Sequence, residues 1–165
     1  MPVYSTGRFA RLDKGYDKHC SPVAITNLIT DIHPELPGQE VFLKVADIGI
    51  RNHYYWNIKA RFFGGTFDIL TGAYLKKALK EFHINNYRVL GPFISTPEKI
   101  EYYLRRGDYV LLQMHFHPKY GFHHVLLCGM RNGRYLTMDG WRERIVLLDK
   151  KDLRKSGFYA VHNIF

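Results

Sequence analysis

The sequence predicts an α+β fold in which N-terminal helices pack on a C-terminal antiparallel sheet. Up to residue 82, apolar residues recur at the three- and four-residue spacing of helices. After that point, short apolar runs alternate with turn residues, which is typical of strands. The chain has 165 residues, with no internal repeat and no linker rich in Pro, Gly or Ser. We therefore expect one domain spanning residues 1–165.

Three segments of the first half have helical spacing, and the expected helices are 21–32, 38–50 and 71–82. The first of them begins at Ser21-Pro22, because proline is tolerated in the first turn of a helix. The polar residues 1–19 before it are expected to form an irregular arm with one short strand.

The second half is expected to begin with a strand at 87–94 and then a fourth helix. A capping box with an early proline, Ser95-Thr96-Pro97-Glu98, opens this helix, and Gly107 ends it. The remaining β-type runs are 108–116, 122–130, 135–141, 143–148 and 158–165.

Composition argues against several classes of function, and a basic nucleic-acid-binding domain is the last-ranked alternative. The net charge is +9, but Lys and Arg are spread along the whole chain, so a nucleic-acid partner is not favoured. No segment has the pattern of a signal peptide or the length of a membrane span. We expect no membrane interaction and a cytoplasmic location. Two cysteines cannot form a disulfide framework, and Cys128 lies in an apolar run where a buried, inert thiol is expected.

The other cysteine, Cys20, is placed for chemistry, since it stands at the mouth of the first helix. Free amide groups and the helix dipole favour a negative charge there, which lowers the pKa of a thiol. The competing interpretation is a structural cysteine that happens to start a helix. A thiol nucleophile also needs a base within hydrogen-bond reach, and the base needs a group that orients it.

Among nine histidines, the pair His123-His124 is the best candidate for that base, because it opens a strand of almost pure apolar residues. A hairpin turn at 131–134 leads to a second strand that ends in Asp139. A two-residue loop would place His124 on the face of Asp139, whereas a three-residue loop would place His123 there. The residues alone leave this choice open.

Cys-Ser-Pro at a helix start, followed late in the chain by His, Gly and Asp, resembles the papain-like cysteine peptidases. The similarity is greatest to the bacteriocin-processing (double-glycine leader) peptidase domains and their cytoplasmic relatives. Those domains carry Gly six positions and Asn or Asp sixteen positions after the base. Counting from His123 reaches Gly129 and Asp139, with Trp141 where papain has Trp, whereas counting from His124 reaches neither Gly nor Asp.

The resemblance implies a papain-like cysteine peptidase fold and a triad of Cys20, His123 and Asp139, with His124 as the alternative base. Such a thiol hydrolase would cleave an amide or thioester bond of a peptide or acyl substrate through an acyl-enzyme, without a cofactor or metal. The family places Gln six positions before the cysteine as an oxyanion donor, and this chain has Lys14 there. Lys14 or Tyr16 would have to replace it. Because of this departure, a catalytically idle peptide-binding module and an acyltransferase remain alternatives.

Overall fold

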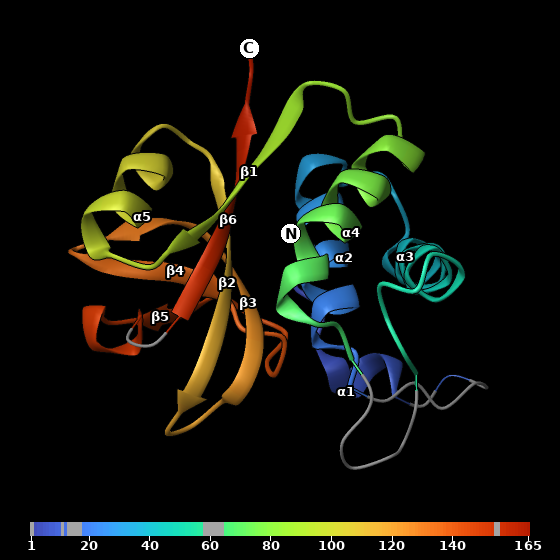
Figure 1. Ribbon diagram of the computed structural model, residues 1–165, viewed down its shortest axis with the longest axis horizontal. Coiled ribbons are helices and arrows are strands. Elements are labelled where there is room, and N and C mark those ends of the chain that lie inside the picture. The colour runs from blue at the N-terminus through green and yellow to red at the C-terminus, as the bar shows by residue number, and fades with distance from the viewer. Residues whose placement is uncertain (1, 11, 13–17, 58–64, 154–155) are drawn as a thin grey trace.

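The computed structural model describes the chain except residues 1, 11, 13–17, 58–64 and 154–155 (Figure 1). The helices of the first half are α1 (Thr6–Phe9), α2 (Cys20–Ile32), α3 (Gly38–Arg51) and α4 (Asp68–Glu81). The elements of the second half are β1 (Tyr87–Ile94), α5 (Pro97–Arg105), β2 (Tyr109–His117), β3 (Gly121–Arg131), β4 (Arg134–Met138), β5 (Val146–Leu148), the 3-10 helix η1 (Lys150–Leu153) and β6 (Ser156–Asn163).

The strands form one six-stranded antiparallel sheet in the order β1-β6-β2-β3-β4-β5. Figure 1 shows α2, α3 and α4 on one side of this sheet and α5 on the other. The α+β prediction, with N-terminal helices packed on a C-terminal antiparallel sheet, is thus confirmed.

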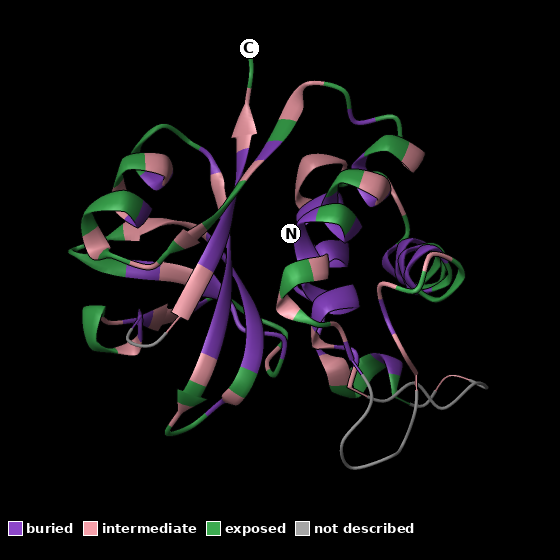
Figure 2. Cartoon of the chain, in the orientation of Figure 1, coloured by how far each residue is buried: buried purple, intermediate pink, exposed green. Residues whose placement is uncertain are grey.

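Each face of the sheet has its own apolar core, because successive side chains of a strand point to opposite faces. In β3, Leu126 belongs to the core shared with α2, α3 and α4. Its neighbours Val125 and Leu127 belong to the core shared with α5. Helix α2 lies between the sheet and α3, and its residues 21–30 are all buried (Figure 2). A fully buried aliphatic side chain contributes about 1.5–3 kcal/mol, so α2 is a rigid base for the residue that begins it.

The prediction of a strand within residues 1–19 is wrong for the part of that arm which the structure describes. Ser5 instead caps the short helix α1 by accepting a hydrogen bond from the amide of Arg8. The amide and carbonyl of Tyr4 bond to the side-chain amide of Asn27 on α2, at 2.8 and 3.0 Å. Because Asn27 satisfies both main-chain groups of Tyr4, the arm stays fixed there without a partner strand.

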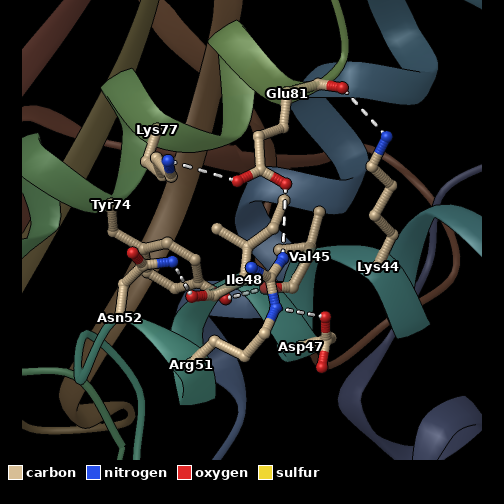
Figure 3. A network of polar contacts seen from close by, with 9 residues as sticks. All are labelled: Lys44, Val45, Asp47, Ile48, Arg51, Asn52, Tyr74, Lys77 and Glu81. Carbon is tan, nitrogen blue, oxygen red and sulfur yellow. Dashed lines mark hydrogen bonds and ion pairs between the residues drawn. The ribbon is translucent and has the colours of Figure 1, made fainter.

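A polar network joins α3 to α4 (Figure 3). The guanidinium of Arg51 contacts Asp47 on its own helix and Glu81 on α4, at 2.7 and 3.3 Å. Tyr74, which is fully buried, donates from its hydroxyl to the carbonyl of Val45 at 2.6 Å. These contacts fix α4 against α3, and the first turn of α4 borders the site described next.

Candidate active site

Cys20 is the first residue of α2 and lines a cleft of about 1020 Å³. The start of α4 and the neighbouring ends of β2 and β3 form the other walls. The residues that line the cleft are Thr6, Lys18, His19, Cys20, Gly65, Thr66, Phe67, Asp68, Ile69, Met114, Tyr120, Phe122, His123, His124 and Trp141. The predicted nucleophile therefore borders a space large enough for a substrate.

The imidazole that faces Cys20 is that of His124. The Cys20 Sγ lies 3.5 Å from His124 Nδ1, and His124 Nε2 lies 3.2 Å from the Thr71 hydroxyl. The Asp68 carboxylate is 3.6 Å from the same Nε2. An ionised carboxylate can only accept a hydrogen bond. The Asp68 carboxylate beside Nε2 therefore favours the His124 tautomer that carries its hydrogen on Nε2. That tautomer leaves the Nδ1 lone pair directed at the thiol, as a base requires.

A bulge in β3 decides which histidine shares a face with Asp139. The turn between β3 and β4 is the two-residue loop Asn132-Gly133, with both residues in the left-handed region. Alone it would place His124 on the face of Asp139. The pairing shifts by one position between Leu127 and Gly129, however, because Cys128 is an extra residue. By that register Asp139 shares a face with His123, and His124 points to the opposite face, toward α2.

His123 also lines the cleft, but its contacts differ from those of His124. Its Nε2 donates to the main-chain carbonyl of Asp139 at 2.5 Å, and its ring stacks on Tyr120 with centroids 5.5 Å apart. Among the described hydrogen bonds, none joins His123 to Cys20. The structure therefore places the alternative base, rather than the favoured one, against the sulfur.

The Asp139 carboxylate is buried and its two oxygens have other partners than an imidazole. One oxygen accepts from the amides of Trp141 and Arg142, at 2.9 and 3.0 Å. The other accepts from the Tyr120 hydroxyl at 2.8 Å. Because Asp139 caps this turn, β4 ends at Met138 and the predicted run 135–141 is not a strand throughout. The contact between Asp139 and His123 is made by the main-chain carbonyl of Asp139, not by its carboxylate.

Burial favours the neutral forms of Cys20 and His124. It raises the pKa of the Cys20 thiol, and this effect outweighs the lowering by the main-chain amide of His124 and by the amides at the start of α2. The predicted lowering by the helix start is thus present but is not the larger effect. Burial likewise lowers the pKa of His124, while the charge of Asp68 opposes that shift. Both shifts favour a thiol hydrogen-bonded to a neutral imidazole over an ion pair.

Sequence reasoning missed Thr71 and Asp68, since neither belongs to a motif with Cys20 or His124. The signal that could have found Asp68 is its acidic side chain, because acidic residues are common in the first turn of a helix. The helix was predicted to begin at residue 71, whereas α4 begins three positions earlier, at Asp68. The expected oxyanion donors Lys14 and Tyr16 lie outside the described residues. Cys128 is only partly buried, and burial raises its pKa to about 11, which favours an unreactive thiol.

No family model matches the chain, and no curated protein matches it by sequence. Several solved structures match its fold. The peptidase domain of Streptococcus ComA, a bi-functional ABC transporter involved in quorum sensing, has a TM-score of 0.55 at 9% identity, covering 88% of this chain and 93% of that one. A putative C39-like peptidase from Bacillus anthracis has a TM-score of 0.54 at 12% identity, covering 88% of each chain.

A third match is the double glycine motif protease of an AMS/PCAT transporter, solved with its leader peptide. Its TM-score is 0.50 at 12% identity, covering 89% of this chain and 86% of that one. The chain therefore has the papain-like fold of C39 peptidase domains, and the predicted resemblance is confirmed at the level of the fold.

Two further properties bear on function. Within the described ranges, no helix combines the length and the apolar character that crossing a membrane requires. In the same part of the chain, no three His, Cys, Asp or Glu side chains are grouped to hold a metal ion.

Proposed function

We propose that this protein is a papain-like thiol hydrolase with Cys20 as nucleophile and His124 as general base. The observation that carries the proposal is the 3.5 Å approach of Cys20 Sγ to His124 Nδ1 beside an open cleft. A nucleophile and base within hydrogen-bond reach are the minimum that covalent catalysis requires.

In the proposed reaction, His124 Nδ1 takes the thiol proton as Sγ forms a bond to the substrate carbonyl carbon. The main-chain amide of Cys20, at the free end of α2, would donate to the oxyanion, with Lys14 or Tyr16 as the second donor. The imidazolium then protonates the leaving amine as the C–N bond breaks. His124 next deprotonates a water molecule, which attacks the thioester and releases the acid as Sγ regains its proton.

A peptide is the favoured substrate. One protein of the same fold was solved with a leader peptide bound, and the cleft of this chain exposes apolar side chains that could contact one. Phe67, Phe122 and Trp141 line the cleft and are 56%, 66% and 46% exposed. Side chains of this kind bind apolar segments of an extended chain by removing them from water.

The test is hydrolysis of a peptide library followed by mass spectrometry, with four single variants measured in parallel. Cys20→Ala should abolish cleavage, and Cys128→Ala, a matched control at the other thiol, should not. His124→Ala should lower kcat more than His123→Ala does. If the triad is instead Cys20, His123 and Asp139, as the family resemblance implies, His123→Ala should lower kcat more than His124→Ala does. Cleavage that survives Cys20→Ala would refute the proposed function.

A second candidate function is a peptide-binding module whose hydrolytic site is idle. The observation in its favour is the raised pKa of Cys20, because the thiolate is the nucleophilic form. This candidate predicts that peptides selected from the library bind without being cleaved, and that Cys20→Ala leaves their affinity unchanged. Adding a primary amine to the same assay separates hydrolysis from acyl transfer by its product.

A further inference from the structure

We propose that Asp68, held by His115, is the positioning carboxylate of His124, the role that the family resemblance implies for Asp139. This inference rests on the proposed function, since it assigns the group that orients the proposed base. It places the orienting group on α4 rather than in the turn that follows β4.

The geometry brings one carboxylate between two imidazoles. Asp68 Oδ1 lies 3.6 Å from His124 Nε2, and Asp68 Oδ2 accepts a hydrogen bond from His115 Nε2. His124 pairs with Gln113 across β2 and β3, so His115, two positions further along β2, points to the same face of the sheet. Both histidines therefore present their Nε2 atoms to Asp68 from neighbouring strands.

The main chain of Asp68 is anchored to the sheet. Its carbonyl accepts from the Gln113 side-chain amide at 3.0 Å and from the Tyr159 hydroxyl at 3.4 Å. These donors come from β2 and β6, so two strands fix the start of α4. As the first residue of a 14-residue helix, Asp68 also has its negative charge stabilised by the helix dipole.

Thr71, fully buried one turn further along α4, completes the arrangement. Its hydroxyl oxygen accepts from His124 Nε2 at 3.2 Å. The hydrogen on His124 Nε2 thus has two nearby acceptors, the neutral Thr71 hydroxyl at 3.2 Å and the Asp68 carboxylate at 3.6 Å. Both acceptors favour the tautomer that leaves Nδ1 free for the Cys20 proton.

The charge of Asp68 has a defined chemical task. When His124 takes the thiol proton it becomes an imidazolium in a site where burial lowers its pKa. The titratable groups that face it are Cys20 from α2, Asp68 from α4, His115 from β2 and His123 from β3. Asp68 is the one of these whose charge raises the pKa of His124, so it stabilises the protonated base. The Asp139 oxygens are already occupied by Tyr120 and by main-chain amides.

The test compares Asp68→Asn with Asp139→Asn in two measurements. The first is long-range ¹⁵N–¹H NMR of the His124 ring in the resting protein, which reports its tautomer and its pKa. The second is the kcat and KM of peptide cleavage. Asp68→Asn should lower the pKa of His124 further and lower kcat about ten- to hundredfold at a KM within about twofold. Asp139→Asn should leave the His124 ring signals in place.

Two more variants keep the test decisive if Asp68→Asn fails to fold. His115→Gln retains a hydrogen bond to Asp68 and removes an imidazole whose charge lowers the pKa of His124, so the His124 pKa should rise above its wild-type value. Asp68→Glu moves the carboxylate on a longer side chain and should shift the His124 pKa from its wild-type value. The inference is overturned if Asp68→Asn, or both of these variants in its place, leave the His124 ring unchanged, or if Asp139→Asn alone shifts it. Because the NMR measurement needs no turnover, an inactive protein would refute the proposed function without deciding the role of Asp68.

Discussion

Alkylation of Cys20 by iodoacetamide, followed from about pH 6 to about pH 10, tests the balance of two opposing effects on this thiol. Burial raises its pKa above the usual 9.0, although the main-chain amide of His124 and the amides at the start of α2 act in the opposite direction. A thiol of pKa 9 is about 1% thiolate at pH 7, and each further unit lowers that fraction tenfold. Since the thiolate is the form that reacts, the rate at pH 7 should be about a hundredth of the rate at pH 10 or less.

The assay is mass spectrometry of the peptide that contains Cys20 after timed quenching. Cys128 serves as an internal reference, because its pKa of about 11 predicts that its rate is still rising steeply at the top of this pH range. The variant Cys128→Ala shows that the two sites are independent. Half-maximal reaction of Cys20 below about pH 7 would mean that it rests as a thiolate beside an imidazolium. That result would refute the conclusion that burial outweighs the helix start.

Three other predictions concern stability. Tyr74→Phe removes the hydroxyl that donates to the buried carbonyl of Val45, so the free energy of unfolding in urea should fall by about 0.5–1.5 kcal/mol, and an unchanged value would contradict this. Gly72→Ala places a methyl group 2.5 Å from the Tyr159 ring, so the variant should unfold at a lower temperature despite alanine's advantage of about 1 kcal/mol in a helix; a higher Tm would show that the ring moves aside. Burial lowers the pKa of His124 in the folded state, so as the pH falls the unfolded chain takes up a proton at a higher pH than the folded protein does. The contribution of His124 to the free energy of unfolding is therefore complete above pH 6.5 and decreases as the pH drops below that value. Urea unfolding at several pH values should show this slope, and His124→Gln should reduce it.

Much of the fold could be predicted from local patterns in the sequence. Helix 21–32 is observed as Cys20–Ile32, and strand 87–94 is observed with those bounds. Both depend on apolar periodicity and on nearby turn residues, which local sequence contains. The N-terminal arm was mispredicted, because the hydrogen bonds of Tyr4 go to Asn27, a residue 23 positions away. Local sequence holds no signal of such a partner.

By itself, the sequence determined the order of helices and strands, the place of Cys20 at the start of a helix, and the presence of two adjacent histidines on one strand. Only the tertiary structure decided which histidine meets the sulfur, because α2 packs on the face of β3 that carries His124. One extra residue in β3, Cys128, turns Asp139 to the opposite face, away from the one that the hairpin turn alone would give it. The tertiary structure also brought Thr71 to His124 across 53 positions of the chain. A contact of that kind depends on how a helix lies against a sheet, and the packing of distant apolar side chains sets that position.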